Sequence, residues 1–120
     1  MALQDAIAAA RMSKQTLLAV YDKLHHIVLQ QLSDGENTDE ESEEQTQVSS
    51  QITQQSDIIA NLEAANSVVS SPTMDEINEV AGILNQVKNL AVEDAMLAEG
   101  RALLTQAASS AMDLSGKIKT

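Results

Sequence analysis

Apolar residues recur along this chain at alternating spacings of four and three, the rhythm of one face of a helix packed against other helices. The first such stripe comprises Leu3, Ile7, Ala10, Leu17, Tyr21, Leu24 and Val28. Lys14 is the one charged residue in this register, and Leu18 beside it can fill the gap while the lysine stem lies along apolar surface. The pattern predicts a first helix that ends near Leu32, where Ser33-Asp34-Gly35 follows.

A second stripe has the same spacing but is more polar. It comprises Val48, Ile52, Gln55, Ile59, Leu62, Asn66 and Val69. The helix it predicts ends at Ser70-Ser71-Pro72-Thr73, because a proline disfavours helical geometry in the residue before it. Thr73 with Glu76 matches a capping box, in which each side chain accepts a hydrogen bond from a free backbone N–H at a helix start. A third helix is therefore expected to begin here.

The third stripe is the strongest. Two neighbouring rows form it: Ile77, Val80, Leu84, Val87 and Ala91, and, at intervals of seven, Ile83, Leu90, Leu97, Leu104, Ala111 and Ile118. They predict a long helix from about Met74 to about Leu114. Gly100 interrupts it at a cost of about 1 kcal/mol relative to alanine. The helix either continues straight through this glycine or breaks there into a fourth helix.

The composition limits what else this chain can form. Among 120 residues there is one aromatic side chain, Tyr21, with one Pro, four Gly and no Cys. The lack of Cys excludes disulfides and thiolate metal sites, and the lack of aromatics disfavours β-sandwiches and barrels. We predict an all-α fold: one domain over residues 1–120, built as an elongated antiparallel three-helix bundle with coiled-coil packing.

The short connection at Pro72 predicts an antiparallel hairpin of the second and third helices. Folding the chain about this turn places Leu62 near Ala81 and Ile59 near Leu84, and leaves the residues after Gly100 without a partner. An apolar face without a partner in water usually finds one. We therefore predict an interaction seam formed by Leu90, Leu97, Leu104, Ala108, Ala111 and Met112.

Two charged residues, Asp94 and Arg101, fall on this seam one heptad apart. Charges at seam positions are costly unless paired, and they often set the register or oligomeric state of packed helices. Asp94 and Arg101 either set the register in this way or mark the point where the seam turns outward near Gly100.

Acidic residues are concentrated in one segment. Residues 34–44 read DGENTDEESEE and hold seven acidic and no basic residues, against a net charge of -11 for the whole chain. Because like charges at this density resist burial, we predict a flexible acidic loop over residues 33–45, whose second half has helix-capping patterns. The loop also offers an electrostatic contact for a basic partner. It is not an EF-hand, because Gly35 directly follows Asp34.

Enzyme chemistry has little support in these residues. The two histidines, His25 and His26, are adjacent and point about 100° apart on a helix, and a zinc site would need further ligands. No Cys nucleophile, Gly-rich phosphate loop or HExxH motif occurs. We predict no catalytic residue, no metal and no cofactor. The sequence also lacks a 20-residue apolar span and a signal-peptide pattern, which predicts a cytoplasmic protein or one exported without a cleaved signal.

Three functions follow from these features. The leading hypothesis is a non-enzymatic helical protein–protein interaction or assembly protein that binds itself or a helical partner through the seam. The second is a component or secreted substrate of a bacterial export system or phage particle, because small acidic helical chains rich in Ala, Gln, Ser and Thr are similar in composition to such proteins. The third is an acidic nucleic-acid mimic inhibitor. Direct binding to nucleic acid is disfavoured, because the acidic chain would repel phosphates.

Overall fold

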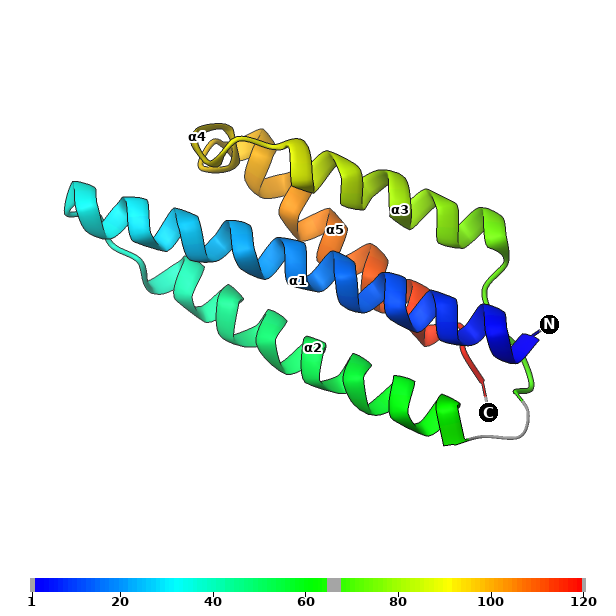
Figure 1. Cartoon of the computed structure of the whole chain (residues 1–120). Coiled ribbons are helices and arrows are strands. Elements are labelled where there is room, and N and C mark those ends of the chain that lie inside the picture. The colour runs from blue at the N-terminus through cyan, green and yellow to red at the C-terminus, as the bar shows by residue number, and fades with distance from the viewer. Residues whose placement is uncertain (1, 65–67, 120) are drawn as a thin grey trace.

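The computed structural model describes residues 2–64 and 68–119, which form an elongated all-α bundle about 52 × 24 × 15 Å in extent (Figure 1). The prediction of an all-α fold is confirmed. Five helices are assigned within the described ranges, instead of the predicted three. They are α1 (Ala2–Asp34), α2 (Asp39–Ala64), α3 (Met74–Asn89), α4 (Val92–Ala95) and α5 (Ala98–Gly116).

Helix α1 is the central element of the bundle. It contacts α2, α3, α4 and α5, and it runs antiparallel to α2 and α5 (Figure 1). Of the predicted stripe, Ala10, Leu17 and Leu24 are buried, whereas the other four residues are half-buried. The buried face includes small residues that let neighbouring helices approach closely. Its fully or almost fully buried apolar residues are Ala6, Ala9, Ala10, Leu17, Val20, Leu24 and Ile27.

The prediction that the second and third helices pack as an antiparallel hairpin about Pro72 is wrong. Among the described residues α2 and α3 do not contact each other, because each packs separately on α1. Ile59 of α2 lies in a cluster with Ala6 and Ala10, whereas Ile77 and Val80 of α3 pack with other residues. The predicted stripe residue Asn66 lies outside the described residues.

The capping box at the start of α3 is confirmed. The backbone N–H of Thr73 donates to Glu76 Oε1 at 2.9 Å, and the backbone N–H of Glu76 donates to Thr73 Oγ1 at 3.2 Å. Glu76 also accepts a hydrogen bond from the Lys117 ammonium at the end of α5. The Lys117 hydrogen bond, assisted by the bonds from Thr73, lowers the pKa of Glu76 despite the opposing effect of burial. The start of α3 is thus linked to the end of α5.

The predicted long third helix is broken, but not at Gly100. Helix α3 ends at Asn89, and its C-cap residue Leu90 has an extended backbone at φ -74° and ψ 121°. Helix α5 begins after Leu97, which is also extended, at φ -80° and ψ 159°. These two extended residues, with the single turn of α4 between them, reverse the chain so that α5 packs back on α3 and α1 (Figure 1). Of the two alternatives from the sequence, the folded-back chain is therefore found, with its break at 90–97.

Gly100 has a different role from the predicted one. It is buried inside α5, and a Cβ atom added to it would lie 2.1 Å from the Asp94 carbonyl oxygen and 2.6 Å from the Ala95 Cα. Both of these are backbone atoms of α4, which cannot rotate away as a side chain would. Glycine at this position is therefore what allows α4 to pack directly on the first turn of α5.

Replacing Gly100 with alanine is expected to destabilise the protein by about 1–3 kcal/mol, as overpacking of a tight contact does. The matched control is Gly82→Ala in α3, where an added Cβ meets no atom within 4 Å. There alanine should stabilise the helix by up to about 1 kcal/mol. Urea denaturation followed by circular dichroism measures both changes, and an equal effect at the two glycines would contradict the proposed contact.

The predicted acidic loop over 33–45 is much shorter in the structure. Residues 33–34 belong to α1 and 39–45 to α2, which leaves 35–38 as the connection. Gly35 takes a left-handed φ of 74° that starts this turn. The Asn37 side chain accepts a hydrogen bond from the Asp39 backbone N–H at 2.8 Å. Acidic residues in the first turn of α2 are favoured because they lie at the positive end of the helix dipole.

None of the described helices is both long enough and apolar enough to span a lipid bilayer.

Candidate interaction groove

The six residues predicted to form one interaction seam do not form a single surface. Leu104 and Ala111 are fully buried in the core that α5 forms with α1. Leu90 is half-buried at the end of α3, and Leu97 is 62% exposed at the corner before α5. Most of the apolar face after Gly100 is therefore covered by the chain itself.

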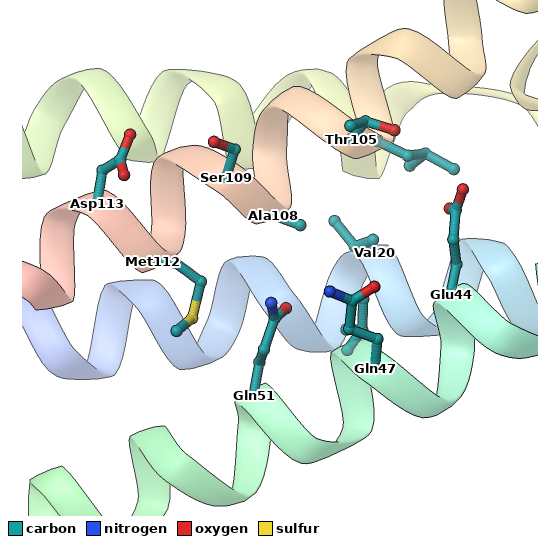
Figure 2. A pocket seen from close by; sticks show the side chains of 11 residues that line it. Val20, Glu44, Gln47, Gln51, Thr105, Ala108, Ser109, Met112 and Asp113 are labelled. Atoms are coloured by element: carbon teal, nitrogen blue, oxygen red, sulfur yellow. The ribbon is translucent and has the colours of Figure 1, made fainter.

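The remaining two seam residues, Ala108 and Met112, are half-buried on α5 and line a groove between α5 and α2. The groove has a volume of about 380 Å³. Val20 of α1, Val48 of α2 and Leu104 of α5 contribute the other apolar residues that line it. Figure 2 labels three of these apolar residues, Val20 on α1 and Ala108 and Met112 on α5.

Polar side chains form the edges of the groove. Gln47 and Gln51 project from α2, and Thr105 and Ser109 from α5 (Figure 2). On the α5 side the groove-lining residues Thr105, Ala108 and Ser109 are all small, so this wall leaves space instead of filling it. The groove therefore lies where polar residues on α2 face small residues on α5. Both helices pack on α1, which contributes Val20 to the lining.

Arg101 joins α2 and α5 at one end of the groove. Its guanidinium donates to Glu41 and, from Nη2 at 2.8 Å, to Glu44 Oε1. The side chains of Arg101 and Glu41 are only 17% and 10% exposed. Arg101 therefore forms its ion pairs with α2 of its own chain. Asp94, the other predicted register-setting residue, is exposed in α4 and does not approach Arg101 in an ion pair among the described residues.

The ionisation of this cluster reflects its surroundings. Burial would lower the pKa of Arg101, but the hydrogen bonds and charges of Glu41 and Glu44 outweigh it and raise that pKa. Burial would likewise raise the pKa of Glu41, but hydrogen bonds from the backbone, Arg101 and Gln31 lower it on balance. Arg101 and Glu41 are therefore both charged at neutral pH, and with the formal charge of Glu44 the cluster carries a net charge of -1.

Gln55 joins α2 and α5 at the other end of the groove. Its side chain is fully buried, and Nε2 donates to the Met112 sulfur at 3.5 Å. Two buried acceptor oxygens near this end, Oε1 of Gln51 and Oε1 of Gln55, have no hydrogen-bond partner among the described residues. An unpaired buried acceptor costs about 1–3 kcal/mol. The groove wall therefore contains a site where a hydrogen-bond donor would be stabilising.

The titratable side chains that line the groove are two carboxylates. The charged residues that line it are Glu44 and Asp113, and neither histidine of the chain lies among the lining residues. His25 and His26 lie on α1, where His26 Nδ1 is 3.0 Å from the Asp22 carbonyl oxygen. Over the described ranges no cluster of three metal-ligating side chains occurs.

Reasoning from the sequence identified Ala108 and Met112 but missed the α2 side of the groove and the partners of Arg101. The acidic segment that supplies Glu41 and Glu44 was assigned to a solvated loop. A signal was present nonetheless, because an arginine on an apolar face requires a buried carboxylate. Comparisons with protein-family models, with curated proteins and with solved structures find no match for this chain.

Proposed function

We propose that this protein is a non-enzymatic protein–protein interaction module, and that it binds a helix of a protein partner in the groove between α2 and α5. The observation that carries the proposal is the incomplete packing of these two helices. They are joined at Arg101 and at Gln55, and between these points the half-buried apolar side chains of Ala108 and Met112 on α5 remain partly open. An amphipathic helix lying in such a groove is a common mode of recognition.

The groove accommodates a helix in the same way that the bundle packs its own helices. A partner helix lying along the groove would contact Gln47 and Gln51 on the α2 side and Ala108 and Met112 on the α5 side, in a coiled-coil-like arrangement. Met112 suits such a contact because methionine is flexible and adapts to different apolar surfaces. Assembly through Leu104 would instead require the bundle to open.

The two other hypotheses remain distinguishable from this one. A component or secreted substrate of an export system or phage particle would be found in culture medium or in particles, and the groove would then be its assembly surface. An acidic nucleic-acid mimic would use the exposed carboxylates of α2, among them Asp39, Glu40 and Glu43. The mimic has less support, because Arg101 already neutralises part of this charge by pairing with Glu41 and Glu44.

Peptide selection tests the proposal. A displayed library of helical peptides is selected on the native protein, on Ser109→Trp and on Ser50→Trp. Ser109 is exposed and lines the groove, so tryptophan there should occupy it, whereas Ser50 is an equally exposed α2 residue that does not line it. We expect enriched peptides with apolar residues at i, i+3 and i+7 to bind the native protein and Ser50→Trp, and to lose at least tenfold in affinity for Ser109→Trp.

Enrichment that is unchanged by Ser109→Trp, or the absence of any enriched helical pattern, would contradict binding in the groove. Circular dichroism melts of both tryptophan variants provide the control that the bundle is intact.

A further inference from the structure

The two helices that form the groove are acidic, and two of their carboxylates, Glu44 and Asp113, line it. Helix α2 carries seven acidic residues and no basic one, and α5 carries Glu99 and Asp113 against Arg101, so the two helices together have a net charge of -8 at neutral pH. The one cation, Arg101, is already paired with two carboxylates. Because Arg101 is shared by Glu41 and Glu44, this end of the groove keeps one net negative charge, and Asp113 at the other end also lines a cleft with Lys117.

The two charged residues that line the groove lie at opposite ends and on opposite helices. Glu44 is on α2 beside Arg101, and Asp113 is on α5 next to Met112 (Figure 2). Gln51 lies seven positions after Glu44 on α2, and Asp113 lies eight positions after Thr105 on α5, separations of about 10 and 12 Å along a helix. This length equals about two turns, the spacing of apolar residues at i, i+3 and i+7.

Besides its glutamine amides and hydroxyls, which also donate, the groove offers several acceptors. They include the Glu44 and Asp113 carboxylates and the Gln51 Oε1 atom, which is buried without a partner among the described residues. Lysine and arginine side chains carry only donors. Their long apolar stems can also lie along the edge of the groove while the charged ends reach the carboxylates.

Taking the proposed function as its basis, we infer that the helix bound in the groove is a basic amphipathic helix. It presents a two-turn apolar stripe to Ala108 and Met112, with a lysine or arginine at each end of the stripe. One of these cations lies beside Glu44, where the cluster with Arg101 keeps one net negative charge, and the other lies beside Asp113. A second copy of this chain fits poorly in this place, because each copy carries a net charge of -11 and would bring further negative charge.

The inference is tested with three labelled synthetic helical peptides in fluorescence anisotropy titrations. The first has leucine at i, i+3 and i+7 with lysine at the remaining exposed positions, the second has glutamate in place of lysine, and the third has the composition of the first in scrambled order. The protein variants are Asp113→Asn, Asp113→Lys and Ser109→Trp, with Asp57→Asn as the control. Asp57 is an exposed α2 residue that does not line the groove.

We expect the lysine peptide to bind best. Its affinity should fall about two- to fivefold in Asp113→Asn, as for one exposed ion pair, more in Asp113→Lys, and little in Asp57→Asn. Ser109→Trp should abolish its specific binding. Because exposed charges are screened by salt, raising the ionic strength should weaken the lysine peptide and not a neutral one.

Several outcomes would overturn the inference. Equal binding of the glutamate and lysine peptides, both lost in Ser109→Trp, would leave the groove as a helix-binding site and remove its preference for basic partners. Equal binding of the scrambled peptide would show attraction to the acidic surface without recognition of a stripe. A dimer in light scattering that Ser109→Trp dissociates would identify the occupant as a second copy. Failure of the lysine peptide to bind would also refute the inference, while the library selection decides the proposed function separately.

Discussion

Leu104→Asp is expected to unfold the chain, whereas Leu97→Asp should leave the fold and its stability almost unchanged. Leu104 has no exposed surface, and Leu97 is 62% exposed. Loss of a buried leucine side chain costs about 2–5 kcal/mol, and burial of an unpaired carboxylate costs several more. That sum is comparable to the whole free energy of unfolding of a small domain, about 5–15 kcal/mol. Circular dichroism spectra and thermal melts of the two variants measure the difference.

This pair of variants also distinguishes an internal helix from an assembly surface. If the region after Gly100 were an interface, either aspartate would leave a folded monomer and remove an oligomer from the size-exclusion profile. A folded Leu104→Asp protein would therefore contradict the position of α5 in the core. Leu32→Asp provides a further control, because Leu32 is 61% exposed and lies on α1, outside the predicted seam.

Arg101→Met is expected to lower the free energy of unfolding by about 3–5 kcal/mol, the usual cost of removing one member of a buried ion pair. The reason is that Glu41, 10% exposed at its side chain, would keep its charge without the arginine that compensates it. Combining Arg101→Met with Glu41→Met should recover much of this loss, because a matched apolar pair replaces the charged one. Urea denaturation of the single and double variants completes the cycle, and additive losses would show that the two side chains do not interact.

The same cluster gives stability a defined dependence on pH. Although burial raises the pKa of Glu41, hydrogen bonds from the backbone, Arg101 and Gln31 leave it below its ordinary value. A carboxyl group with a lowered pKa stabilises the fold fully above the pKa of the unfolded chain, about 4.3. This contribution is lost as the pH falls through the lower pKa of the folded state. The difference in stability between the native protein and Arg101→Met should therefore shrink below about pH 4.

Local features of the sequence were sufficient for several predictions. The end of α1 near Gly35 and the capping box at Thr73 and Glu76 were both predicted and both found. Such features depend on residues within four positions of one another, and their geometry repeats in any helical protein. The all-α fold follows in the same way, because the spacing of three and four and the lack of aromatics are properties of the chain alone.

Predictions that needed distant contacts were the ones that failed. The apolar spacing of Ile83, Leu90 and Leu97 continues without interruption, yet the chain reverses between the last two of these residues. One long helix that projects beyond the bundle and two helices that fold back on α1 would show the same periodicity of apolar residues in the sequence. The choice between them depends on burial of Ala95 and Leu104 in the common core, which is decided only when the other helices are in place.

The charges illustrate the same division. Seven acidic residues in one short segment predict repulsion and exposure, and for Asp39 and Glu40 that holds. Glu41 is nevertheless buried, because its charge is paired with that of Arg101, which lies sixty positions further along the chain and joins α5 to α2 at one end of the groove. Helix periodicity and capping depend on residues a few positions apart and are therefore determined by the sequence alone. Which helices are neighbours, where the long apolar stretch turns, and which carboxylates find a cation are settled by contacts between distant residues, and these form only when the whole bundle is packed.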